Sequence, residues 1–232
     1  MTPLRRKLGV ERPLVLFGLV AATGACVALE ATREVLYGLG YRFLLWNLIL
    51  AWIPLLLSLV VYDSYRRSAR IGRLLPLLGL WLLFLPNAPY IATDIIHVRQ
   101  SPAASRLYDL GLVGAAGATG VLLGFASLFL VHCVLRHRFG SRRGWAVVAA
   151  TLALTSAGVY VGRFLRWNSW DLVSRPGRLV GQLLPHLADQ SAVARAGLLI
   201  ALTAGGLGLG YTVFYRLLAP ARNRKTPPGE KR

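Results

Sequence analysis

Residues 110–135 read LGLVGAAGATGVLLGFASLFLVHCVL and contain no aspartate, glutamate, lysine or arginine. A helix of about 20 apolar residues crosses the hydrocarbon core of a bilayer, which is about 30 Å thick. This stretch exceeds that minimum, so it predicts a membrane-spanning helix. Five further apolar stretches of similar length accompany it, and the six expected spans are roughly 14–31, 43–62, 74–92, 110–135, 145–161 and 193–219.

The composition agrees with a membrane protein. Of the 232 residues, 55% are hydrophobic and only 16% are charged, which is too apolar for an ordinary soluble domain. The length indicates one domain. The sequence therefore predicts an all-α integral membrane bundle of about six transmembrane helices. A basic tail is expected at residues 1–13 and a disordered basic tail at 220–232.

Basic residues are sorted between the two ends of the expected spans. Both termini and the second and fourth gaps hold 18 of the 27 lysines and arginines, whereas the opposite side holds 6 of the 9 acidic residues. Lysine and arginine are retained in cytoplasmic loops. We therefore expect a multi-pass protein of the cytoplasmic membrane, with both termini in the cytoplasm and membrane lipids as its surroundings. The net charge of +18 does not indicate nucleic acid, because the basic residues lie at the ends of apolar runs.

The first span has a rival interpretation as a cleaved signal peptide, because a charged start precedes its apolar stretch. The stretch is longer than the usual apolar core of a signal peptide, and Thr23-Gly24-Ala25 is a poor cleavage site. We therefore expect the first span to be retained.

Small residues recur in two spans, and they let helices approach closely where lipid supplies no hydrophobic drive. They are Gly111, Gly114, Gly117 and Gly120 in the fourth span, and Gly206 and Gly210 in the sixth. These glycines either pack within one bundle, or they form the seam of a homodimer or a thin wall beside a pore. Pro54 lies in the middle of the second span and predicts a kink there, with freed carbonyls bonded inside the bundle.

The longest gap, residues 162–192, contains a short amphipathic stretch. Its apolar face carries Leu179, Val180, Leu183, Leu184 and Leu187, and its polar face carries Arg178, Gln182, His186 and Asp189. The stretch is too short and too polar to span. We expect a helix in the outer membrane interface between the fifth and sixth spans, or a lid over the bundle mouth.

A first polar motif, LPNAPYIATDIIH, closes the third span at residues 85–97. Pro86 and Pro89 interrupt the helical hydrogen bonds near the outer boundary. If the helix resumes after Pro89, then Tyr90, Asp94 and His97 share one face, which Asn87 extends. Asp94 and His97 are then within hydrogen-bonding reach.

A second polar motif, GRFLRWNSWD, follows the fifth span at residues 162–171. Arg163, Arg166 or Trp167, and Trp170 would share a helical face. Arginine on this side runs against the charge sorting, so it needs another reason. Pairing with Asp94, Asp109 or Asp171 is one, and binding a phosphate or carboxylate from outside is another.

Both motifs are expected on the same non-cytoplasmic side, where they form a candidate binding site. Its residues are Asn87, Tyr90, Asp94, His97, Arg163, Arg166, Trp167, Asn168, Trp170 and Asp171. The alternative is that these residues only cap helices and anchor the headgroup region. We expect no metal, since Asp94 and His97 offer two ligands and no clear third, and no cofactor. Signatures such as H-E-x-x-H, G-x-S-x-G and the Walker loop are absent from the sequence.

Three functions from different classes fit these features. The first is a binding or assembly protein whose outer site recognises an anionic lipid headgroup, an envelope component or a partner membrane protein. The second is a small transporter or channel, lined by the broken third span and the kinked second span. The third is a membrane enzyme acting on envelope lipids, with Asp94 and His97 as an acid–base pair and the arginines holding phosphate.

The string LPNAPY at 85–90, followed by Thr93-Asp94 and His97, and the string GRFLRWNSWD at 162–171 resemble a known family. It is the bacterial membrane family catalogued as domain of unknown function 1361, and the resemblance covers roughly Phe43 to Tyr215. It implies a small multi-span protein of the bacterial inner membrane. It supplies no substrate and no catalytic residue.

Overall fold

The structure, a computed structural model, describes residues 3–38, 40–67, 70–167 and 188–218, with the single positions 174, 177, 181 and 185. Of residues 3–11 and 100 it describes only the backbone. Within these ranges the chain is helical and contains no strand. The elements are α1 (Pro3–Tyr37), α2 (Arg42–Arg66), α3 (Ile71–Phe84), α4 (Asn87–Tyr90), η1 (Ile91–Gln100), α5 (Arg106–Phe139), α6 (Ser141–Phe164) and α9 (Gln190–Leu218).

Six helical segments are long and apolar enough to cross a membrane, which confirms the predicted fold class. They are Arg12–Tyr37, Arg42–Arg66, Ile71–Arg99, Arg106–Phe139, Ser141–Phe164 and Gln190–Leu218. The third of these combines α3, α4 and η1. Because α1 already begins at Pro3, most of the expected tail at 1–13 is helical. Most of the expected interfacial helix at 178–189 and the whole tail at 220–232 lie outside the described residues.

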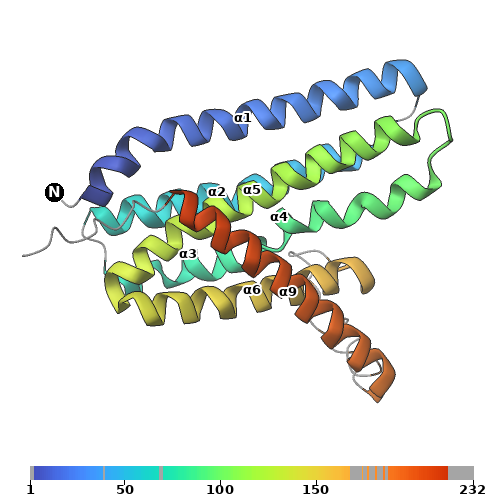
Figure 1. The fold of residues 1–232 in the computed structure, drawn as a ribbon. Coiled ribbons are helices and arrows are strands. Elements are labelled where there is room, and N and C mark those ends of the chain that lie inside the picture. The colour runs from blue at the N-terminus through green and yellow to red at the C-terminus, as the bar shows by residue number, and fades with distance from the viewer. Residues whose placement is uncertain are drawn as a thin grey trace, which may run out of the picture.

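The central helix of the bundle is α5, which is buried along most of its length. It packs against α1, α2, α6 and the broken third span, while α9 packs mainly on α6. Figure 1 shows α9 crossing the other helices obliquely, with its N-terminal half extending away from them. The apolar side chains of α9 are therefore exposed over most of their length, as expected for a helix that faces lipid.

Glycines of α5 allow the broken third span to lie directly against it. A Cβ at Gly120 would stand 2.4 Å from the carbonyl oxygen of Ala88, and one at Gly117 would stand 2.9 Å from Cα of Ala92. No side chain fits in these gaps. This part of the fourth span therefore packs within its own chain, as one of the two alternatives predicted.

The glycines of α9 differ from those of α5. A Cβ at Gly205, Gly206 or Gly208 would meet nothing within 4 Å, whereas one at Gly210 would touch Phe125. A homo-oligomer seam through the sixth span stays a prediction.

Pro54 lies within α2, and a hydrogen-bond chain ties its surroundings to two other helices. Trp81 Nε1 of α3 donates to Ser127 Oγ of α5 at 2.7 Å, and Ser127 Oγ donates to the carbonyl of Pro54 at 2.8 Å. All three residues are buried. A bilayer interior offers no water to these polar groups and lipid cannot bond them. The two hydrogen bonds therefore supply the partners that these groups need.

Candidate functional site

A pocket of about 950 Å³ lies at the end of the bundle where α2 begins and α6 ends. Its walls come from α2, α3, α4, η1, α6 and the residues after α6. Seven of the ten predicted site residues line it, from both motifs: Asn87, Tyr90, Asp94, His97, Arg163, Arg166 and Trp167. The other three, Asn168, Trp170 and Asp171, lie outside the described residues.

A buried ion pair joins the two motifs across the pocket. Arg163 Nη1 of α6 donates to Asp94 Oδ1 of η1 at 3.0 Å, and Asn47 Nδ2 of α2 donates to Asp94 Oδ2 at 3.0 Å. The Asp94 side chain is only 2% exposed. A buried carboxylate is strongly unfavourable unless it is paired and hydrogen-bonded. Asp94 therefore links α2, η1 and α6. Asp94, Asp109 and Asp171 were the carboxylates predicted as partners of these arginines, and Arg163 pairs with Asp94.

The second terminal nitrogen of the Arg163 guanidinium, Nη2, does not take part in the ion pair with Asp94. It is buried and has no hydrogen-bond partner among the described residues. Arginine carries its donors in a rigid fork, so one edge can pair with Asp94 while another faces a second acceptor. An unsatisfied buried donor is unfavourable by about 1–3 kcal/mol. Nη2 of Arg163 is therefore a buried donor whose hydrogen-bonding capacity is not used by the described residues.

Small residues of α6 bring the first motif close to Arg163. The Arg163 Cζ lies 5.9 Å from the centroid of the Tyr90 ring. A Cβ at Gly162 would stand 3.2 Å from that ring, and one at Gly158 would stand 2.5 Å from Cγ of Pro86. The glycine spacing of α6 thus creates the surface on which Pro86 and Tyr90 pack.

The helix break lies at Leu85 and Pro86, between α3 and α4, in the region where the two prolines predicted it. After the break the structure differs from the expectation, because residues 91–100 form a 3₁₀ helix rather than an α-helix. With three residues per turn, positions three apart align, so Asp94 and His97 stack above one another. His97 Nδ1 lies 3.2 Å from the backbone oxygen of Asp94 and 3.7 Å from Asp94 Oδ1.

The second motif leaves the helix earlier than expected. Helix α6 ends at Phe164, and Arg166 has a φ of 56°, in the left-handed region. The prediction that Arg163 shares a helical face with Arg166 or Trp167 is therefore wrong, and Trp170, the other residue of that face, lies outside the described residues. The turn nevertheless places both Arg166 and Trp167 at the pocket, and Arg166 is exposed there.

Sequence reasoning missed Asn47, which holds the second oxygen of Asp94. It lies in the first part of α2, within an otherwise apolar stretch. Polar residues inside spans tend to face the bundle interior and pair there. That signal was present, but the sequence could not show which partner Asn47 meets.

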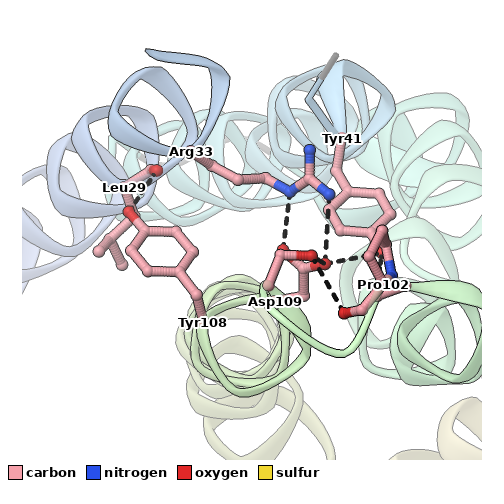
Figure 2. A network of polar contacts seen from close by, with 8 residues as sticks. Leu29, Arg33, Tyr41, Pro102, Tyr108 and Asp109 are labelled. Atoms are coloured by element: carbon pink, nitrogen blue, oxygen red, sulfur yellow. Dashed lines mark hydrogen bonds and ion pairs between the residues drawn. The ribbon is translucent and has the colours of Figure 1, made fainter. Parts of the chain in front are cut away.

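A second buried network lies between α1 and α5 (Figure 2). Arg33 donates to both oxygens of Asp109, with Nε to Oδ1 at 2.7 Å and Nη2 to Oδ2 at 3.2 Å. Ser105 Oγ donates to Asp109 Oδ2 at 3.1 Å, and the Arg33 Cζ lies 4.5 Å from the ring centroid of Tyr41. The charges of Arg33 and Asp109 compensate each other, and their ion pair links the end of α1 to the start of α5. Asp109 is thereby paired with Arg33 and not with Arg163.

Comparison with known proteins places the chain in a family without adding an activity. No curated protein and no solved structure matches it significantly. A family model described as "Protein of unknown function (DUF1361)" matches residues 46–204, which is more than half of the chain. The match includes most of α2, all of α3 to α6 and every pocket-lining residue except Phe43. The chain therefore belongs to the DUF1361 family.

Proposed function

We propose that this membrane protein is a binding protein whose pocket holds an anionic group, from a lipid headgroup or an envelope component. The observation that supports the proposal is the buried, unpartnered Nη2 of Arg163, a residue that lines the pocket and whose Nη1 pairs with Asp94. Asp94, Arg163 and Arg166 together carry one net positive charge. An arginine fork is well suited to a phosphate or carboxylate.

Binding needs only the contacts described above, which distinguishes it from the other two functions. In the acid–base alternative, Asp94 and His97 would each exchange a proton with the substrate. The structure shows His97 Nδ1 3.2 Å from the backbone oxygen of Asp94 and 3.7 Å from its carboxylate. Asp94 is also already engaged by Arg163 and Asn47. For this reason we place binding before catalysis. We place it before transport because the pocket lined by the described residues lies at one end of the bundle.

The pocket is proposed to face the non-cytoplasmic side. The opposite end of the bundle carries the arginine-rich gaps at residues 66–73 and 136–143, which the charge rule places in the cytoplasm. A membrane-impermeant maleimide added to intact cells should then label Arg42→Cys at the pocket end and not Arg142→Cys at the opposite end. The reverse pattern would exclude this orientation.

The anion-binding proposal is tested by Arg163→Lys. Lysine retains the charge that Asp94 needs, but it lacks the rigid second arm. The purified protein in mixed micelles is heated with phosphatidic acid, with glycerol 3-phosphate or with zwitterionic phosphatidylcholine. We expect at least one of the two phosphates to raise the wild-type Tm above the phosphatidylcholine value, and Arg163→Lys to lose most of that gain.

Arg42→Gln is the matched control, because Arg42 is an exposed arginine at the same end of the bundle, paired with Glu34 on the surface. Arg42→Gln should show the same rise in Tm with the phosphates as the wild type. If neither phosphate stabilises the wild type more than phosphatidylcholine does, or if Arg42→Gln and Arg163→Lys behave alike, the pocket is not the anion site.

A further inference from the structure

The pocket is polar at one end and apolar at the other, and this division indicates the chemistry of its ligand. The polar end holds Asp94, His97, Arg163 and Arg166, whereas the other end is lined by Leu50, Gly79, Leu82, Leu83 and Leu154. We propose that the ligand is a phosphate-bearing lipid, with its headgroup at Arg163 and one hydrocarbon chain along the apolar end. This inference rests on the anion-binding function proposed above.

The length of the pocket corresponds to one leaflet. Leu154 and Arg163 both belong to α6 and are nine positions apart, or about 13 Å along the axis at about 1.5 Å per residue. Half of a hydrocarbon core about 30 Å thick is about 15 Å. A lipid whose headgroup reaches Arg163 therefore has its chain beside Leu154, close to the middle of the bilayer.

The apolar end is open toward the surroundings of the bundle. Gly79 of α3 is exposed, and the Leu154 side chain of α6 is 57% exposed. Both belong to segments that are apolar enough to lie in the bilayer, so this opening faces lipid and not water. A lipid can enter sideways between α3 and α6, whereas a soluble anion would have to enter from the polar end.

The two ends of the pocket make different contributions to such a complex. A hydrocarbon chain gains little when it moves from lipid into an equally apolar pocket, so the headgroup decides which lipid binds. The chain instead confines the headgroup to the depth of Arg163. A small soluble anion would leave the apolar end without a partner, and apolar cavities do not hold water well.

Gly79→Leu tests the position of the chain. Gly79 lines the apolar end of the pocket, and a Cβ there meets nothing within 4 Å, so the fold can accommodate a larger side chain at this position. Gly72→Leu is the matched control, because Gly72 is also an exposed glycine of α3 with nothing within 4 Å and does not line the pocket. Binding of phosphatidic acid and of glycerol 3-phosphate is measured for both variants by native mass spectrometry and by the rise in Tm.

We expect the wild type to bind phosphatidic acid more tightly than glycerol 3-phosphate. Gly79→Leu should lower the affinity for phosphatidic acid by about tenfold, as expected when an apolar site is overfilled. It should leave the affinity for glycerol 3-phosphate unchanged. Gly72→Leu should change neither. If the wild type binds both phosphates equally, or if Gly79→Leu and Gly72→Leu bind phosphatidic acid alike, the lipid inference is wrong and the anion site stands. If neither phosphate binds the wild type, both proposals fail.

Discussion

The ion pair between Asp94 and Arg163 gives the most quantitative prediction. Its side chains are 2% and 13% exposed. Removing one partner of such a pair leaves an uncompensated buried charge, which lowers the free energy of unfolding by about 3–5 kcal/mol. Asp94→Asn and Arg163→Met should each have an effect of this order. The double variant leaves no buried charge, so its loss should be smaller than the sum by about 2 kcal/mol or more.

The assay is reversible unfolding by sodium dodecyl sulfate in mixed micelles, applied to the wild type, both single variants and the double variant. The pair Arg12–Asp63 provides the control cycle, since its oxygen–nitrogen distance is 2.8 Å but its side chains are 27% and 40% exposed. Its coupling should be about 0–1 kcal/mol. If the losses at Asp94 and Arg163 add within about 0.5 kcal/mol, the two motifs do not form one site and the reasoning above is refuted.

Two further predictions concern the packing around the pocket and the core. Gly158→Ala places a Cβ 2.5 Å from Pro86 and should lower the free energy of unfolding by about 1–3 kcal/mol, whereas Gly205→Ala meets nothing within 4 Å and should be neutral or slightly stabilising. Equal effects in the same titration would contradict the close approach of α4 to α6. Trp81→Phe removes the donor to Ser127 and should lower the free energy of unfolding by about 1 kcal/mol or more. An unchanged unfolding midpoint would mean that this hydrogen bond contributes no stability.

The fold class was predictable because the bilayer leaves few alternatives. Uninterrupted apolar stretches of sufficient length must form helices there, and the run at 110–135 became the central helix α5. The helix break was predictable for a similarly local reason, since Pro86 and Pro89 remove backbone donors. The 3₁₀ form of residues 91–100 was not predicted, because the helix was expected to resume as an α-helix after Pro89.

The candidate site was predictable in composition but not in its contacts. The sequence places an aspartate and arginines at the same end of the apolar spans, where they need charged partners. This limited the predicted partners of Arg163 to a few carboxylates. The choice of Asp94 depends on how α4 packs on α6, which the glycines of α6 permit, because η1 follows α4 directly. The role of Asn47 and the pairing of Asp109 with Arg33 likewise follow from the way distant helices meet. No local pattern contains that information.

The most direct measurement of the central claim is an electron cryo-microscopy map of the protein extracted with its native lipids. We predict elongated density in the pocket, with a headgroup against Nη2 of Arg163 and a tail reaching Leu154. A pocket that contains only water, with Arg163 turned away from Asp94, would contradict the account.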